Sequence, residues 1–301
     1  MRRPLAALFT CSLAGLLPGC SDGPSASGSI TPPGPPPAPQ TFSLRFFGTG
    51  TGDIDRVKIP LLNTNTTDRP VNVGATDFTV EFWIKGNKPD NPSVACTTGA
   101  VGKDFWATGA VVIDRDVLGD GDFGDYGAAL FNGRIAFGVT RSSGGQTVCG
   151  QRDVLDGGWH HVALTRQRGT GEMKIFVDGA QDAVVLDPTA SQNVQYNSAH
   201  PNPDTNDAFL VLGAEKRSQL NTLSFNGLID ELRLSTVLRY TATFSPPTGA
   251  FAVDANTAAL YHFDEPSGTD IIDASNGNAS PGVLSPAGSG APSHRSTDVP
   301  F

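Results

Sequence analysis

Apolar and polar residues alternate along several short segments of this chain, and this period of two constrains its fold more than any other feature. In residues 77–86 (DFTVEFWIKG), alternate positions are occupied by Phe78, Val80, Phe82 and Ile84. Neighbouring side chains of a β-strand point to opposite faces of its sheet, so this alternation is typical of a strand with one buried face. The pattern predicts that these four side chains lie in a core.

The same pattern recurs along the chain. We expect further strands at residues 41–47, 56–60, 109–114, 126–131, 134–141, 147–150, 159–167, 173–178, 208–213, 226–235, 258–263 and 281–285. Asn132-Gly133, Asp178-Gly179 and Asn226-Gly227 are turn signals, because such pairs readily adopt the positive φ angles of tight hairpins. This arrangement predicts an all-β fold, a two-sheet antiparallel jelly-roll sandwich. One helical turn is expected near Thr236–Tyr240, and a long loop at residues 187–207.

Composition excludes two other classes of protein. The 301 residues include 35 Gly and 23 Pro, the two poorest helix formers, which argues against a helical bundle. Acidic residues outnumber basic ones 30 to 21. Because phosphate neutralisation needs clustered Lys and Arg, we expect no nucleic-acid partner.

The N-terminus has the pattern of an export signal. Arg2 and Arg3 precede the apolar run Leu5–Leu17, which is too short to span a membrane. The run ends in residues 17–20 (LPGC), which resemble a bacterial lipobox, although Pro18 replaces the usual small residue. We therefore expect residues 1–19 to be a signal peptide and Cys20 to carry a lipid that anchors the protein to the cell envelope, at the outer membrane or cell surface. An ordinary cleaved signal is the alternative.

Composition also divides the mature chain. Residues 20–40 are rich in Pro, Ser and Gly, and we interpret them as a semi-rigid tether, with plain disorder as the alternative. The folded domain is expected at residues 41–285, followed by a flexible tail at 286–301. Two cysteines remain in the domain, Cys96 and Cys149. In an exported protein they predict a disulfide, and a buried free pair or reactive thiols are the alternatives.

Three stretches carry a resemblance to a known family. They are residues 77–85 (DFTVEFWIK), 156–179 (DGGWHHVALTRQRGTGEMKIFVDG) and 225–235 (FNGLIDELRLS). Arg239-Tyr240, Phe244, Pro246-Pro247 and residues 259–265 (ALYHFDE) follow in the expected order. Together they resemble the laminin-G-like jelly roll of the concanavalin A-like lectin/glucanase superfamily. The resemblance implies two antiparallel sheets, one of them concave, and often a calcium ion near the sandwich edge. It also implies binding of glycans, glycosaminoglycans or proteins, with hydrolases in some branches.

The sequence shows no local pair of carboxylates of the kind that a glycosidase uses, although folding could assemble one. Retaining enzymes need two carboxyl groups about 5–5.5 Å apart. The Glu-x-Asp-x-x-Glu run of the glucanase branch is missing, and Glu81 has no acidic residue two positions further on. His160 and His161 are adjacent on a strand, so they face opposite ways and cannot jointly chelate one metal. We expect a non-enzymatic protein in which these histidines are structural.

An aspartate cluster is the sharpest candidate site. Asp114, Asp116, Asp120 and Asp122, together with Asp125, lie between two expected strands. Their spacing is not that of an EF-hand, but calcium prefers oxygen ligands. Our hypothesis is that one or more of them bind calcium or a polar ligand, and an Asp/Gly hairpin connection is the alternative.

The resemblance implies a second calcium site. Modules of this kind often hold the ion with the aspartate of the IDE motif and groups near the N-terminal strand. Asp230 matches the first, and Asp53 and Asp55 are the nearest match for the second. In the alternative, Asp230 bonds backbone amides or Arg233.

For sugar binding we expect an exposed aromatic ring, and Trp106 in a polar stretch is the best candidate. The sequence as a whole predicts a non-catalytic, lipid-anchored recognition module whose partner is a glycan or an extracellular protein, with calcium as a candidate structural ion. A structural lipoprotein without a small ligand and a carbohydrate-active enzyme of the same superfamily are the alternatives.

Overall fold

The computed structural model describes residues 41–48, 55–64, 66–97, 104–117, 125–141, 144–186, 192–197, 207–216, 223–275, 277–285 and 294–301. Several predicted features lie outside these residues: the signal peptide, Cys20, the tether, Asp53, Asp120 and Asp122. Residues 40–301 form one compact unit. No helix within the described ranges is long and apolar enough to cross a membrane.

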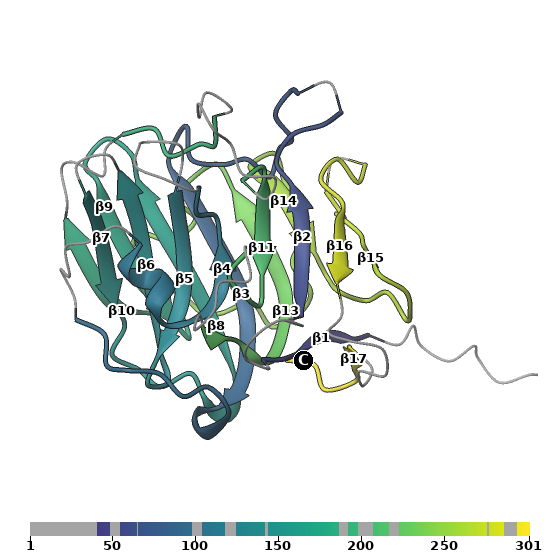
Figure 1. Ribbon diagram of the computed structural model, residues 1–301, viewed down its shortest axis with the longest axis horizontal. Coiled ribbons are helices and arrows are strands. Elements are labelled where there is room, and N and C mark those ends of the chain that lie inside the picture. Colours follow the sequence, from purple (N-terminus) through teal and green to yellow (C-terminus); the bar gives the residue numbers. More distant parts are fainter. Residues whose placement is uncertain are drawn as a thin grey trace, which may run out of the picture. The chain divides into compact units, whose positions relative to one another are not determined.

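Two β-sheets form this unit (Figure 1). In the first sheet, the described strands follow the order β10 (Ala180–Leu186), β9 (Glu172–Val177), β8 (Asp156–Gln167), β3 (Phe78–Asn87), β13 (Asn226–Ser235), β1 (Ser43–Phe47) and β17 (Arg295–Ser296), with β14 (Thr257–Tyr261) beside β13. In the second sheet, they follow the order β15 (Asp270–Ile271), β16 (Gly282–Ser285), β2 (Arg56–Pro60), β11 (Phe209–Leu212), β4 (Ala110–Asp114), β5 (Asp125–Phe131), β6 (Arg134–Arg141) and β7 (Gly144–Cys149), with β12 (Leu223–Ser224) beside β4. Two short 3-10 helices, η1 (Lys88–Asp90) and η2 (Phe105–Thr108), complete the described elements.

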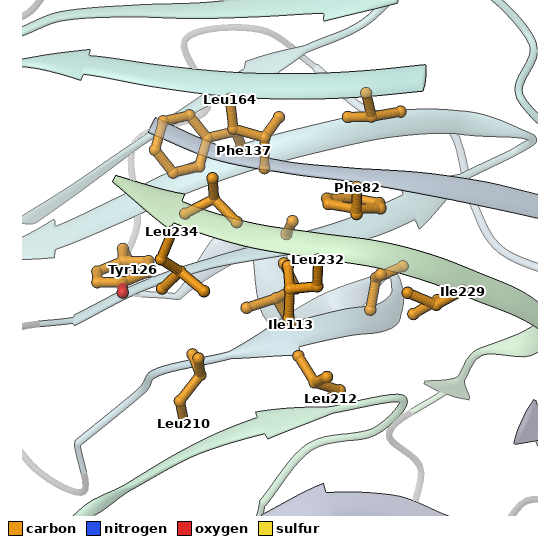
Figure 2. Packing of buried hydrophobic residues seen from close by; sticks show 14 of the residues in the cluster. Phe82, Ile113, Tyr126, Phe137, Leu164, Leu210, Leu212, Ile229, Leu232 and Leu234 are labelled. Carbon is orange, nitrogen blue, oxygen red and sulfur yellow. The ribbon is translucent and has the colours of Figure 1, made fainter. Parts of the chain in front are cut away.

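The predicted all-β sandwich is confirmed. All strand pairs of the described residues are antiparallel except β12 with β4. The alternating side chains of β3 lie between the two sheets, and Figure 2 shows Phe82 among residues of both. Phe82, Leu164 and Leu234 come from the first sheet, and Ile113 and Leu212 from the second. The apolar face predicted from the period of two is therefore the face that this core buries.

Two of the three expected hairpin turns are present. Asn132-Gly133 joins β5 to β6 and Asp178-Gly179 joins β9 to β10, with positive φ at all four residues. The turn expected at Asn226-Gly227 is wrong, because these residues begin β13 and pair with β1. Glycine is needed at position 227 for close packing: a Cβ there would lie 2.4 Å from both the Lys85 carbonyl oxygen and the Phe225 ring.

The first sheet is covered on its outer face by chain without regular structure. The helical turn expected near Thr236–Tyr240 does not form. Instead, Tyr240 and Phe244 stack on each other and contact the rings of His161 and Phe176. In a β-sandwich one sheet face is buried in the core, and here residues 236–256 contact the opposite face.

The C-terminal residues also belong to the sandwich. We expected residues 286–301 to be a flexible tail, but β17 pairs with β1, and Asp298 bonds Lys85 at 2.7 Å and Trp159 at 2.9 Å. The expectation is therefore corrected for residues 294–301. Their sequence has no alternating pattern, because they contribute mainly polar contacts to a sheet edge.

The predicted disulfide is confirmed between Cys96 and Cys149, whose Cα atoms are 5.9 Å apart. It ties the segment after β3 to the edge strand β7. On the chain-entropy model, a ring of this length contributes about 4 kcal/mol to stability.

Candidate functional site

Four aspartates gather on the second sheet where β4 ends and β5 begins. Asp114 is the last residue of β4, Asp125 is the first of β5, and the two strands are antiparallel neighbours. Asp116 follows β4, and Asp104 comes from the residue before η2. We call Asp104, Asp114, Asp116 and Asp125 the acidic rim.

The carboxylates of the acidic rim order the loops around them. The two oxygens of Asp114 accept hydrogen bonds from the backbone N–H groups of Asp116 at 2.7 Å and Lys216 at 2.6 Å. Asp125 accepts one from the N–H of Val117 at 2.7 Å. The hairpin role that the sequence left open for these aspartates is thus part of what they do.

Their charges are poorly compensated. Burial, together with the negative charge of Asp116, raises the pKa of Asp104 to about 7, that of Asp114 to about 6 and that of Asp125 to about 8. Lys216 opposes the rise of the pKa for Asp114, and Arg115 opposes it for Asp125. Carboxylates held together against their own repulsion are the usual electrostatic environment of a cation site.

The donor chemistry of the acidic rim suits calcium, which takes carboxylate and carbonyl oxygens. Nevertheless, no three His, Cys, Asp or Glu side chains of the described ranges are already arranged around one point that could hold a metal. Calcium would therefore need backbone carbonyls or the adjacent Asp120 and Asp122, which lie outside the described residues.

Trp106 does not provide an exposed ring. Its side chain is 1% exposed on η2, so the expectation of a sugar-stacking surface there is wrong. The ring lies over two glycines: a Cβ on Gly127 or on Gly138 would come within 2.1 Å of it. These glycines leave a flat hollow on the outer face of β5 and β6, and Trp106 fills it.

The second calcium hypothesis joins Asp55 and Asp230 in one site, but in the structure Asp55 contacts one part of the first sheet and Asp230 lies in another. Asp55 accepts hydrogen bonds from the Phe47 N–H at 2.7 Å and from His294 at 2.9 Å. Phe47 lies opposite Asn226, four residues before Asp230 on β13, a separation of about 13 Å along a strand. The structure therefore places Asp55 and Asp230 apart.

Asp230 has different acidic neighbours. Burial, together with the charges of Glu231 and Asp264, raises its pKa to about 8. Asp264 in turn accepts a hydrogen bond from the N–H of Phe42, just before β1. Asp264 thus lies between the start of the N-terminal strand and Asp230. The sequence did not predict this arrangement, because Asp230 and Asp264 are far apart in the chain. Asp230 also bonds the N–H of Glu231 at 2.9 Å, in agreement with the backbone-amide alternative.

Glu81 is part of a buried network on the outer face of the first sheet. It is 0% exposed and contacts His161 at 3.2 Å, Arg233 at 2.9 Å and the Tyr240 hydroxyl at 2.7 Å. Burial raises its pKa, but the hydrogen bond with His161 and the charge of Arg233 outweigh that effect, so the pKa is lowered. His161 is thus bonded across the sheet, as the sequence predicted.

The fold and these contacts agree with a match of residues 63–241, more than half of the chain, to a laminin G family described as "Concanavalin A-like lectin/glucanases superfamily". The chain belongs to this family. No curated protein sequence matches it.

Solved structures similar to this laminin-G-like chain are distant. A candidate carbohydrate-binding protein from Bacteroides ovatus has 18% identity and a TM-score of 0.46, over 82% of this chain and 59% of that one. A pentraxin from Limulus polyphemus has 12% identity and a TM-score of 0.38, over 66% of this chain and 77% of that one. Domains LG4-5 of the mouse laminin α1 chain have 16% identity and a TM-score of 0.40, over 69% and 45%. The laminin-G-like chain thus spans little more than half the length of the first of these.

Sequence reasoning missed Asp104 as a member of the acidic rim. It is ten residues before Asp114 and reaches the rim because η2 folds over the second sheet, where Thr140 donates a hydrogen bond to Asp104 at 2.6 Å. No sequence spacing links Asp104 to Asp114 or Thr140, because the contact of Asp104 with the rim depends on how η2 packs on the second sheet.

Proposed function

We propose that this laminin-G-like chain is a non-catalytic recognition module that binds carbohydrate or protein ligands at the acidic rim, with calcium. The observation that carries the proposal is the group of buried, poorly compensated carboxylates at the end of β4 and the start of β5. A cation bound among them would relieve their repulsion and leave coordination positions for ligand oxygens.

The environment of Glu81 supports a non-catalytic role. A glycosidase needs one carboxyl group that can donate a proton and a second that faces the sugar. Glu81 is fully buried, and its oxygens already contact Arg233, His161 and Tyr240. A carbohydrate-active enzyme of the superfamily remains the competing function, and reducing-sugar release from polysaccharides would identify it.

The N-terminal sequence supports export and anchoring as part of the proposal. A lipid on Cys20, followed by the Pro-rich residues 20–40, would hold the domain away from the envelope surface. A structural lipoprotein would need the same anchor but would bind no ligand.

Calcium titration of the chelator-treated protein tests the proposal. We expect a hundredfold excess over Kd to raise Tm by about 5 °C or more. We expect Asp116→Asn and Asp125→Asn to reduce the shift, and Asp270→Asn, at an exposed position on β15, to leave it unchanged.

A glycan array with and without calcium completes the test. Calcium-dependent retention of glycans supports the proposal. An unchanged Tm together with no calcium-dependent ligand would overturn it.

A further inference from the structure

Three neighbouring hollows open at one end of the sandwich. The topology brings them together, since β3 begins where its neighbours β8 and β13 end. The loop after β2, which lies uppermost in Figure 1, borders the same end. The hollows have volumes of about 440, 390 and 650 Å³, each within the usual range of ligand sites.

The hollows adjoin one another. The first and second share Asp68 and Gln195, and the second and third share Thr76 and Thr236. An occupant could therefore extend from the loop after β2 to Arg168 at the end of β8. We call these three adjoining hollows the polar groove.

Many side chains of its lining carry a hydroxyl or an amide group. The residues with these groups are Thr66, Thr67, Asn72, Thr76, Asn193, Gln195, Tyr196, Asn197 and Thr236. Its charges balance, with Asp68 and Asp77 against Arg69 and Arg168. Arg168 also donates a hydrogen bond to the carbonyl of Ala75 at 2.7 Å. The groove thus offers many neutral donors and acceptors and no net charge.

Its walls are held in place by a buried polar network. Asn72 is 4% exposed, and its side chain donates to Asp68 at 2.9 Å and to the carbonyl of Tyr196 at 3.2 Å. Its oxygen accepts from the Tyr196 N–H at 3.0 Å and from Arg115 at 2.9 Å. Gln195 donates a hydrogen bond to Asp68 at 3.1 Å where the first and second hollows meet. A wall fixed in this way loses little entropy when it binds a ligand.

We propose that the polar groove binds an extended neutral oligosaccharide, a ligand class that rests on the recognition function proposed above. Sugar hydroxyls both donate and accept hydrogen bonds, as the amide and hydroxyl groups of the groove do. A sulfated or uronic polymer would need a cationic surface, and the charges here cancel. A peptide would need large apolar anchor pockets. The apolar side chains of the lining are divided among the three hollows, and they are Leu62, Pro70, Val73, Ala75 and Val237.

The groove also lies next to the acidic rim. Arg115 separates Asp114 from Asp116 in the sequence, and its guanidinium bonds Asn72 at 2.9 Å and the Val194 carbonyl at 3.2 Å. A calcium ion at the rim would therefore stiffen the groove without entering it.

Neutral oligosaccharide ladders test the groove with the intact domain. We would measure Kd by calorimetry for xylo-, manno- and malto-oligosaccharides of increasing length, in calcium and in chelator. Affinity for one series should rise with chain length as successive hollows fill. The double variant Thr67→Ala/Gln195→Ala should weaken it roughly tenfold, because it removes about two net hydrogen bonds. Arg168→Ala tests the far hollow, and Gln181→Ala, at an exposed position on β10, is the control that should change nothing.

Several outcomes would overturn the proposal that the groove binds the ligand. If the Thr67→Ala/Gln195→Ala and Arg168→Ala variants bind as well as the wild type, in particular when Asp116→Asn abolishes binding, the groove is not the binding site and the proposed function still stands. Preference for a sulfated glycan or a peptide removes the neutral ligand class. Failure of every glycan and protein probe overturns both proposals. Melting curves of each variant confirm that a loss of binding is not a loss of folding.

Discussion

Single side chains of this protein are placed by two kinds of signal, of which only one is local. The period of two in residues 78–84 is local, and it predicted which side chains reach the core. The burial of Trp106 is not local, because it depends on Gly127 and Gly138 in two other strands. The polar sequence around Trp106 therefore does not predict that its side chain is buried.

The histidine pair illustrates the same division. Strand geometry predicts that His160 and His161 face opposite ways. It does not predict their partners, because Glu81 and Asp178 come from other parts of the sheet. His160 lies between two carboxylates, at 2.8 Å from Asp178 and 3.0 Å from Asp156.

This arrangement makes the stability of the protein depend on pH. The hydrogen bond to Asp178 is the main factor that raises the pKa of His160 to about 9, and Asp156 adds to it against the effect of burial. The contribution to stability is full below the unfolded pKa of about 6.5 and is lost as the pH rises through about 9. Because solvent screens the carboxylates, we expect about 1 kcal/mol. His160→Gln should lower the free energy of unfolding by that amount at pH 6 and hardly at all at pH 10. Equal losses at both pH values in urea titrations would contradict the charge pairing.

At the scale of elements, strands with alternating patterns were predictable and the covering segments were not. β10 was missed although Asp178-Gly179 signalled a hairpin, and β17 was missed because two residues carry no pattern. Residues 236–256 cover the first sheet through separate aromatic contacts such as that of Tyr240 with His161. Such segments follow the shape of the sheet beneath them rather than a periodicity of their own.

The packing of η2 on the second sheet gives the prediction at this scale. A Cβ on Gly138 would lie 2.1 Å from the Trp106 ring, so Gly138→Ala must displace η2. Overpacking of this kind costs about 1–3 kcal/mol. Gly169→Ala is the matched control, since nothing lies within 4 Å of its added methyl group. Chemical denaturation should show a loss of stability for Gly138→Ala and none for Gly169→Ala. A Gly138→Ala variant as stable as the wild type would contradict the packing.

For the whole molecule, one core joins both sheets, and the candidate ligand sites gather at one end of it. The acidic rim and the polar groove both lie where strands end, and Arg115 connects them through Asn72. The sequence located the acidic part of this end, because the aspartates cluster in the chain. It could not locate the groove, whose walls come from the loop after β2 and from residues 192–197, brought together by folding.

The division of the chain gives the last prediction. The compact unit covers residues 40–301, so we expect its fold not to depend on the sequence that precedes it. We expect a fragment of residues 40–301 to melt within about 2 °C of the full chain, a difference of less than about 1 kcal/mol. Location should depend on Cys20 instead. In a bacterial host, the wild type should sediment with membranes, and Cys20→Ser should be released with its melting temperature unchanged. Cys11→Ser, inside the expected signal peptide, is the control that should still sediment. Membrane association that survives Cys20→Ser would contradict the lipid anchor and assign attachment to the domain itself.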